Sequence, residues 1–442
     1  MKLSFQDARH LLARTGFGGD LIEIDKLMKM DRADAVDHLL GGVGQRAVTS
    51  PSPEVASGPS PTQGMKGLSA DQKKALRQER KEEALALKAW WYQELLATPS
   101  PLTERMTLFW HNHFTSSVKK VKWPALLYRQ NVLLRRHALG SFRDMLFQIA
   151  KDPAMILYLD TQTNRKDHPN ENFARELFEL YTLGEGQYSE QDIKEAARAF
   201  TGWHVALRHG GEVTFHRQQH DSGVKRVLGR TGMLSSDDVL AILLEHPQCA
   251  IHLTNKLWRE FVSAESDARE VERLAATFRN NRYQVKLLVR GLLLSPHFWA
   301  MENRGTLVKS PVELLVGTTR MFQLPVKDTE VFAKYGKRLG QDLFAPSNVK
   351  GWPGGTRWIT STTLLARWQL LQRSLRGTEL GMHQHHVMGE AMTHGPAWMA
   401  ESSFDTVQAV LVALPPVTPV LDTADRWSAI RQLVMDPIYQ LK

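Results

Sequence analysis

NENFARELFELYTLGEGQYSEQDIKEAARAFTGW, residues 170–203, predicts two short helices with well-marked ends. In the first helix, apolar residues recur at about 100° per residue and therefore share one face. These residues are Phe173, Leu177, Leu180 and Tyr181. Pro169 and Asn170 favour a helix start, and Gly184 and Gly186 favour its end. We expect this helix to pack its apolar face on a core.

The second helix of this segment carries a capping signal. Ser189 lies three residues before Asp192, as in a helix N-cap. The apolar residues that follow are spaced to face a core: Ile193, Ala196, Ala197 and Phe200. Gly202 is placed to close the helix just before Trp203.

Polar residues of the first helix form a stripe opposite its apolar face: Asn172, Arg175, Glu176 and Glu179. A solvated face with an Arg175–Glu179 pair, which contributes roughly 0.3 kcal/mol, accounts for this stripe in the simplest way. Alternatively, Glu176 and Glu179 project into a site, as paired carboxylates do in helical metal proteins. Partners from elsewhere in the chain would favour the second interpretation.

One candidate partner lies in a helix expected over residues 102–113. His113 follows the spacing of the apolar residues there, whereas His111 is turned about 200° away from them. The two histidines therefore cannot easily chelate one metal, and His113 is the better candidate ligand. A buried histidine that is hydrogen-bonded to a carbonyl or carboxylate is an equally good interpretation.

A second candidate partner is VTFHRQQHDSGVKRVLG, residues 213–229. Its alternation predicts a small hairpin or irregular β element near 212–228 that carries His220, Asp221 and Lys225. These three side chains suit metal binding, proton transfer or anion binding. They also suit an ordinary polar turn.

Motifs along nearly the whole chain match one family, in order. They are ARHLLARTGFGG (8–19), FWHNHF (109–114), DPAMILYLD (152–160), NENFARELFELYTLGEG (170–186), EAARAFTGW (195–203), HDSGVK (220–225), KLWREFV (256–262), KSPVELLVG (309–317) and LGQDLFAPSNVKGWPGG (339–355). By these motifs the chain resembles the bacterial domain of unknown function 1800 family. The family name records that no activity had been assigned.

The resemblance points to individual positions. The family pattern of Trp, any residue, Asn, His and Phe corresponds to Trp110, Asn112, His113 and Phe114, and it leaves His111 outside. The family also has one block over Asn170, Glu171, Asn172, Ala174, Arg175, Glu176, Leu177 and Glu179, and another at His220 and Asp221. Similar proteins usually have a proline where this chain has Ser347, which bears on the expected stiffness of that loop.

Composition limits the size of the core and the kinds of metal site that the chain can form. The chain has 442 residues, of which 42% are hydrophobic, enough for one large core. Cys249 is the single cysteine, so neither a disulfide framework within the chain nor a multi-cysteine zinc site is possible. A metal would have to be bound by His, Asp and Glu. No nucleotide-cofactor motif is evident.

The net charge of +9 favours acidic partners only mildly, and no nucleic-acid-binding motif accompanies it. Nucleic acid is therefore an unlikely partner, and anionic sugars or peptides would account for the charge equally well. The apolar stretch at residues 409–421 is short and broken by prolines, so no integral membrane segment is expected. The N-terminus lacks the apolar run of a signal peptide, which predicts a cytoplasmic protein. Many similar proteins appear to be exported, so a trimmed start would make this chain periplasmic or exported.

Helical periodicity recurs along the chain, so we expect a mainly α fold with one helical domain over residues 1–442 and the small β element near 212–228. Residues 41–68 are rich in Gly, Pro and Ser and predict a flexible linker or loop. The loop at residues 346–358 carries Trp352 and Trp358, whose flat faces suit stacking on a sugar ring. A structural loop that tucks Trp352 into the core is the alternative.

Three hypotheses for the function follow. In the first, a metal-dependent enzyme holds a divalent or iron-type metal on His113, Glu176, Glu179 and His220, and protons are transferred by Glu171, Asp221 or Lys225. Its substrate would be contacted by Asn112, Asn170, Asn172, Arg175, Trp203 and Trp352. In the second, the resemblance implies a non-catalytic helical partner or maturation factor of a sulfatase-like protein, because genes of such proteins often neighbour those of similar chains. In the third, the tryptophan loop and the basic surface bind a carbohydrate or an anion.

Overall fold

The computed structural model describes residues 2–42, 50, 52–53, 69–375, 395–420 and 423–442. These residues form 22 α-helices and two small two-stranded antiparallel sheets. The prediction of a mainly α fold with a small β element is therefore confirmed. Most of the linker predicted at residues 41–68 lies outside the described residues.

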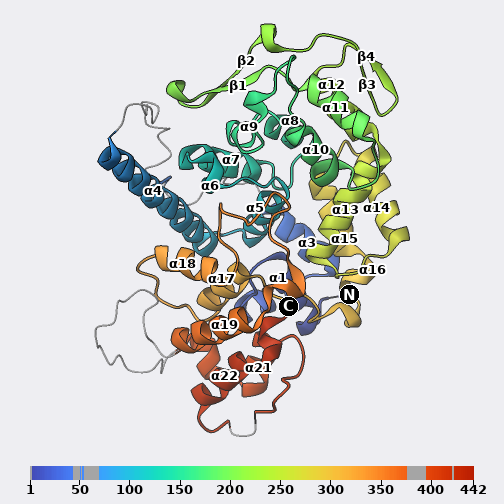
Figure 1. The fold of residues 1–442 in the computed structure, drawn as a ribbon. Helices are drawn as coiled ribbons and strands as arrows, with labels where there is room; N and C mark the ends of the chain where they lie inside the picture. Colours follow the sequence, from blue (N-terminus) through green and yellow to red (C-terminus); the bar gives the residue numbers. More distant parts are fainter. Residues whose placement is uncertain (1, 43–49, 51, 54–68, 376–394, 421–422) are drawn as a thin grey trace.

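The first helices of the chain surround a central buried one, α5 (Figure 1). Their bounds are α1 Phe5–Thr15, α2 Leu21–Met28, α3 Arg32–Gly41, α4 Ala70–Ala97, α5 Pro101–His113, α6 Val118–Val121, α7 Pro124–Arg136, α8 Phe142–Ile149 and α9 Pro153–Tyr158. In α5 every residue from Leu102 to His111 is buried, and so is His113. A helix buried on all sides must satisfy its charged residues inside the protein.

The opening segment contains the two predicted helices, but the second half of the first one is a π-helical turn that the sequence did not predict. It forms α10 (Asn172–Glu176), a π-helical turn η3 (Leu177–Thr182) and α11 (Glu190–Ala199). Gly184 and Gly186 end the first helix with positive φ angles of 84° and 81°. Ser189 and Asp192 form a reciprocal capping box at the start of α11.

Two hairpins form the β structure. Strands β1 (Trp203–Ala206) and β2 (Glu212–Phe215) pair antiparallel, with Trp203 opposite Phe215. Strands β3 (Lys225–Val227) and β4 (Arg230–Gly232) form the second hairpin. The β structure thus begins at Trp203, earlier than the sequence pattern indicated.

The rest of the chain is helical again. The bounds are α12 Ser236–Glu245, α13 Pro247–Phe261, α14 Ala268–Asn280, α15 Val285–Leu294, α16 Pro296–Trp299, α17 Pro311–Met321, α18 Glu330–Arg338, α19 Ser361–Ser374, α20 Ala397–Glu401, α21 Phe404–Leu411 and α22 Arg426–Met435. None of the helices in the described part of the chain is long and apolar enough to cross a membrane.

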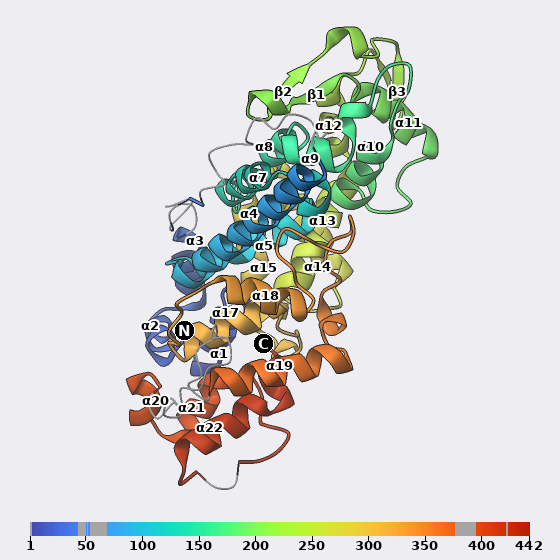
Figure 2. The same cartoon turned by 60° about the vertical axis from the view of Figure 1, so that its left-hand side comes forward.

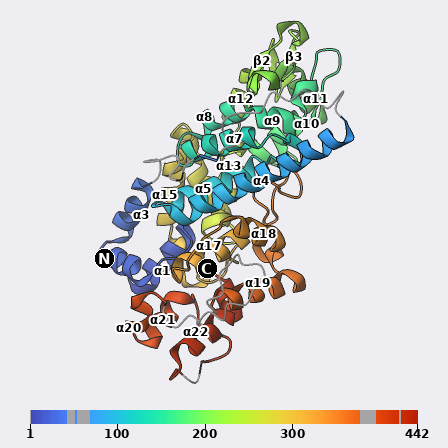
Figure 3. The same ribbon diagram turned by 90° about the vertical axis from the view of Figure 1, so that its left-hand side faces the viewer.

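The molecule is elongated, with the β hairpins at one end and α20–α22 at the other (Figures 2 and 3). Between the two ends, α5 lies among α4, α7, α13 and α17. Buried apolar side chains from Leu3 to Tyr439 pack into one cluster among the described residues. The termini of the described chain lie in the same half of the molecule, near α1 and α17.

Candidate functional site

The carboxylate stripe of the opening segment lies on α10 and η3. Phe173, Leu177 and Tyr181 are buried as predicted, whereas Glu176 and Glu179 remain partly exposed. The helix widens after Glu176, because the Leu183 N–H donates to the Phe178 carbonyl, five residues earlier, at 2.8 Å. Such π-turns are rare and often occur at functional sites.

The last carbonyls of this π-turn accept hydrogen bonds from two histidines. His113 Nε2 lies 3.2 Å from the Tyr181 carbonyl, and His252 Nε2 lies 3.1 Å from the Leu180 carbonyl. His113 is 2% exposed among aromatic rings, and burial lowers its pKa well below the ordinary value. His113 therefore stays neutral and supports the helix end, as the buried-histidine interpretation had it.

The two carboxylates of the stripe have different surroundings. Glu179 lies 3.3 Å from Lys350 Nζ, and the same amino group lies 3.2 Å from Glu185. Burial and the neighbouring Glu179 raise the pKa of Glu176, and no hydrogen bond joins its carboxylate to a residue that the structure describes. Arg175 pairs with Glu171 and Glu190 rather than with Glu179.

Asn112 connects this stripe to the loop over residues 346–358, here called the tryptophan loop. The Asn112 Oδ1 atom accepts from the Trp352 N–H at 2.6 Å, and its Nδ2 lies 3.4 Å from the Trp352 carbonyl. Gly351 has a φ of +81°, and a Cβ there would lie 2.2 Å from Asn112 Oδ1. The glycine thus permits the close approach that places Lys350 beside Glu179.

His220, Asp221 and Lys225 form a self-contained turn attached to α11. Asp221 accepts from Arg198 Nε at 2.7 Å and from the Gly223 N–H at 2.8 Å. Lys225 Nζ donates to the carbonyls of Asp221 and Gly223. His220 Nδ1 lies 3.0 Å from the Thr201 carbonyl. The ordinary polar turn, which the sequence left open, accounts for these contacts.

The remaining predicted substrate contacts lie around the start of α10 and in β1. The Asn170 side chain accepts from the Asn172 N–H at 3.0 Å and donates to Thr163 at 3.1 Å. Asn172 is exposed, and Trp203 is partly buried with Lys151 Nζ 5.4 Å from its ring centroid. No hydrogen bond or ion pair within the described chain joins these residues to Glu176 or Glu179.

The structure does not bring the four predicted metal ligands together. His113 faces a core carbonyl, Glu176 and Glu179 lie on the outer face of the helix, and His220 belongs to the α11 turn. Over the described ranges, no group of three or more His, Cys, Asp or Glu side chains is arranged to hold a metal ion. The metal site stays a prediction of the sequence.

A pocket that the sequence did not indicate lies beneath the tryptophan loop. It has a volume of about 130 Å³ and is walled by α5, α13, α17 and the loop itself. Trp352 and Trp358 line it with exposed fractions of 6% and 7%, and Asn112 also faces it. Two of the predicted substrate-binding residues, Asn112 and Trp352, therefore meet at one cavity.

A buried ion network forms the floor of this pocket. Arg105 of α5 binds Glu260 of α13 and Glu313 of α17, and Lys442 also binds Glu313. Burial alone would raise the pKa of Glu313, but Arg105 and Lys442 outweigh it and lower the pKa to about 2. The network holds four segments of the chain together and keeps Glu313 ionised.

Three polar groups at the pocket remain available to a ligand. Arg259 is exposed and makes no hydrogen bond or ion pair with a described residue. Gln341 accepts from the Val312 N–H at 3.0 Å, which leaves its Nε2 group without a described partner. Glu260 binds Arg105 through Oε1 and keeps Oε2 available, with its side chain 32% exposed.

Sequence reasoning missed the charged residues of this pocket, although Glu260 and Glu313 lie within the family motifs. Arg105 and Glu313 lie in otherwise apolar helical stretches, and such charges need buried partners. This was the available signal. The partner of each charge comes from a different part of the chain, so helical spacing could not pair them.

Comparison with known proteins gives one match. A family model described as "Protein of unknown function (DUF1800)" matches residues 10–441. No curated protein and no solved structure matches the chain. The motif segments at residues 109–114, 256–262, 309–317 and 339–355 all contribute residues to the pocket beneath the tryptophan loop.

Proposed function

This chain belongs to the DUF1800 family, whose function is unknown, and from its pocket we propose that it binds a carbohydrate beneath the tryptophan loop. The proposal rests on one observation. The same cavity is lined by two tryptophans and by polar atoms, both donors and acceptors, that have no partner among the described residues. A cavity of about 130 Å³ has room for about ten water molecules, close to the heavy atoms of one sugar ring.

The tryptophans supply rigid apolar walls. Trp352 is fixed by the hydrogen bonds of its backbone to Asn112, and Trp358 ends a short 3-10 turn, Gly355–Trp358. Because both indoles are mostly buried, only a strip of each faces the pocket. Such a fixed aromatic wall suits the C–H face of a pyranose and loses little entropy when a ligand binds.

The polar groups match hydroxyl groups, which both donate and accept hydrogen bonds. Arg259 and Gln341 Nε2 are donors, and Glu260 Oε2 is an acceptor. The cation and the carboxylate balance each other, so a neutral saccharide fits better than a strongly charged one. A ligand without matching hydroxyl groups would leave these polar groups unpaired, so the pocket discriminates against such a ligand.

Binding fits this pocket better than glycoside hydrolysis does. A two-carboxylate hydrolase needs one carboxyl group whose raised pKa lets it donate a proton. At Glu313 the pKa is lowered to about 2 by Arg105 and Lys442, so this group holds no proton at neutral pH. Glu260 is bound to the same arginine. The proposal is therefore a binding role.

The other hypotheses remain predictions. A metal-dependent enzyme and a partner of a sulfatase-like protein follow from the sequence and its resemblance, and no contact in the described part of the chain favours either one over carbohydrate binding.

The test is binding of simple saccharides to the full chain. Saturation-transfer NMR with methyl β-glucoside, methyl β-N-acetylglucosaminide and glucuronate is expected to show contact for at least one neutral sugar. Arg259→Ala should weaken that contact about tenfold, equivalent to one lost hydrogen bond to a charged group. Arg279→Ala, an equally exposed arginine on the neighbouring helix α14, is the matched control.

Trp352→Ala is less informative, because the buried indole also supports the fold. Trp358→Phe keeps an aromatic wall and should reduce binding only in part. The proposal fails if none of the saccharides contacts the wild-type chain, or if Arg259→Ala and Arg279→Ala behave alike.

A further inference from the structure

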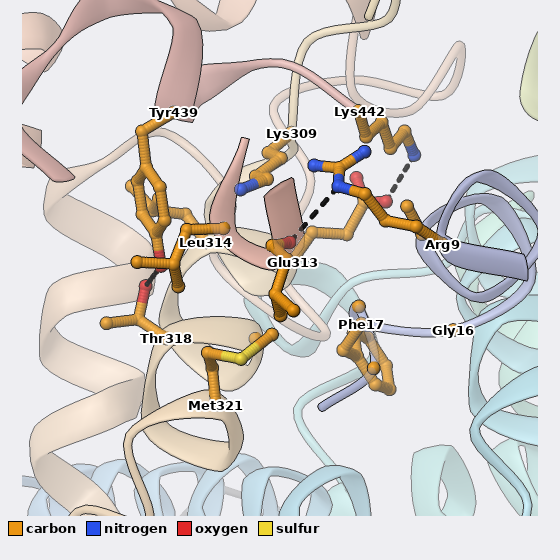
Figure 4. A pocket seen from close by; sticks show the side chains of 16 residues that line it. Arg9, Gly16, Phe17, Lys309, Glu313, Leu314, Thr318, Met321, Tyr439 and Lys442 are labelled. Carbon is orange, nitrogen blue, oxygen red and sulfur yellow. Dashed lines mark hydrogen bonds and ion pairs between the residues drawn. The ribbon is translucent and has the colours of Figure 1, made fainter. Parts of the chain in front are cut away.

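A second, smaller cavity lies between α1, α17 and the last residues of the chain (Figure 4). Its volume is about 40 Å³, and Glu313 and Lys442 lie between it and the carbohydrate pocket. Arg9, Lys309 and Lys442 converge on one side, and Tyr439 and Thr318 form another wall. Three cationic side chains thus face a cavity whose lining contains one carboxylate, Glu313, among the described residues.

Arg9 is unusual among the buried arginines of the described chain. It is 7% exposed, and its Nε donates to the Val410 carbonyl at 3.1 Å. Neither Nη1 nor Nη2 has a hydrogen-bond or ion-pair partner in the described residues. The other described arginines that are less than a tenth exposed all have partners on their terminal nitrogens: Arg14, Arg105, Arg135, Arg304 and Arg367.

Lys309 is a second cation without an anionic partner. Its amino group lies 3.9 Å from the centroid of the Tyr439 ring and makes no hydrogen bond or ion pair with the described chain. Lys442, in contrast, binds Glu313, which also binds Arg105. The single carboxylate of the cavity is therefore already neutralised, and the charges of Arg9 and Lys309 are not.

A buried guanidinium without an anion is costly, because burial removes its hydration and nothing replaces it. Planar guanidinium groups bind carboxylate, phosphate and sulfate through two parallel hydrogen bonds. The cavity has room for about three water molecules, which is close to the size of one such anion.

The turn after α1 adds further donors. Phe17, Gly18 and Gly19 line the cavity, and their N–H groups donate to no residue that the structure describes. Gly317 of α17 lets this turn approach closely, because a Cβ there would lie 2.5 Å from the Phe17 carbonyl. The backbone here is thus packed tightly beside the cationic side chains.

We propose that this cavity is a binding site for one small oxyanion, a phosphate, sulfate or carboxylate group, held by Arg9 and Lys309. The site is distinct from the proposed carbohydrate pocket and does not depend on it. Arg9 supplies its two terminal NH2 groups, Lys309 supplies an ammonium group, and Tyr439 and Thr318 close the cavity on the far side.

The charge of Lys309 makes the site sensitive to pH. Burial, together with the cations Arg9, Arg367 and Lys442, lowers the pKa of Lys309 to about 7, and Glu313 opposes this shift. A bound anion stabilises the ammonium form, so affinity should fall as the pH rises from 6 to 9.

The experiment measures thermal unfolding of the full chain in sodium sulfate and sodium phosphate against sodium chloride at matched ionic strength. At about a hundredfold excess over the Kd, the midpoint of the wild type should lie about 3 °C above its value in chloride, and it should rise with the logarithm of the anion concentration. Arg9→Met should keep the wild-type midpoint in chloride and lose this logarithmic rise. Arg77→Met, which removes one exposed charge from α4, is the matched control.

Sulfate also stabilises proteins without binding, so a rise of the same size in wild type and Arg9→Met would overturn the proposal. If Arg9→Met does not fold, an anomalous map of wild-type crystals soaked in selenate decides: a peak beside Arg9 supports the site, and a cavity without one overturns it. If glucose 6-phosphate competes with sulfate, the natural ligand is a phosphate ester. If glucose 6-phosphate does not compete, the natural ligand is a free ion. Both of these results support an oxyanion site.

Discussion

Glu313 is the residue on which the carbohydrate pocket most depends. It accepts from the Ser310 N–H at 2.7 Å as part of a capping box, and it also binds Arg105 and Lys442. One buried carboxylate thus pairs with two buried cations and fixes the start of α17.

Replacing Glu313 by Gln should destabilise the fold by about 3 kcal/mol, because Arg105 and Lys442 would lose their shared buried anion. Urea unfolding at pH 7 measures this difference. Glu330→Gln, which breaks only an exposed pair with Lys334, should cost less than about 0.5 kcal/mol. Equal effects of the two changes would contradict the network.

The same variant has a defined pH dependence. The pKa of Glu313 is lowered to about 2 in the folded chain, against an ordinary value of 4.5. Its stabilising contribution is therefore complete above pH 4.5 and is lost as the pH falls towards 2. The gap in unfolding free energy between wild type and Glu313→Gln should narrow over this range; a constant gap would count against the ionised carboxylate.

The contribution of Glu176 to the free energy of unfolding should have a pH dependence of the opposite sign. Its raised pKa means that the folded chain disfavours the ionised form, so this cost is absent at low pH and develops as the pH rises through 4.5 and beyond. Because Glu176 is only partly buried, we expect Glu176→Gln to stabilise the fold by only about 0.5 kcal/mol at pH 7. The gain should vanish near pH 4 in urea unfolding. A loss of stability at pH 7 would mean that the carboxylate makes a needed contact.

For single residues, the sequence predicted part of the pattern of burial and little of which contacts each residue makes. Helical spacing correctly assigned His113 to a buried face, but it turned His111 away from the apolar residues, and His111 is buried as well because α5 is enclosed on all sides. The spacing could not predict the hydrogen bond between His113 Nε2 and the Tyr181 carbonyl, because Tyr181 lies 68 positions away in the sequence. Periodicity describes one helix and says nothing about which other helix lies opposite.

At the scale of elements, the tryptophan loop depends on one glycine. Gly351→Ala would place a Cβ 2.2 Å from Asn112 Oδ1 at a positive φ of +81°. We expect a loss of about 3 kcal/mol, from backbone strain and overpacking together. Tryptophan emission should also change, since Trp352 follows directly.

Gly186→Ala is the matched control for this prediction, because Gly186 has the same φ of +81° with nothing within 4 Å of the added Cβ. It should cost only the strain, about 1 kcal/mol. If both changes cost the same in urea unfolding, the close contact between the loop and α5 is not a source of stability.

Helix ends were more predictable than helix interiors. The expected cap at Ser189 forms a reciprocal capping box with Asp192. The π-turn after Glu176 was not predictable, because it lies where His113 and His252 donate to the carbonyls of Tyr181 and Leu180, and both histidines come from other helices. Local sequence determines caps, whereas tertiary contacts determine this change of helix type.

At the scale of the whole molecule, the fold class followed from periodicity, and the pocket did not. Arg105, Glu260, Glu313 and Lys442 are far apart in the sequence and meet only because α5, α13 and α17 pack together. The motifs of the family nevertheless include Glu260 and Glu313. The predicted carboxylate stripe and the observed pocket are joined by the tryptophan loop, which carries Lys350 to one and Trp352 to the other.

The position of a bound saccharide tests the central claim most directly. Crystals soaked with the methyl selenoglycosides of glucose and N-acetylglucosamine would show the ligand by the anomalous signal of selenium. The account predicts a peak in the cavity beneath the tryptophan loop, between Trp358 and Arg259. A saccharide bound elsewhere, or an empty cavity at saturating ligand, would contradict it.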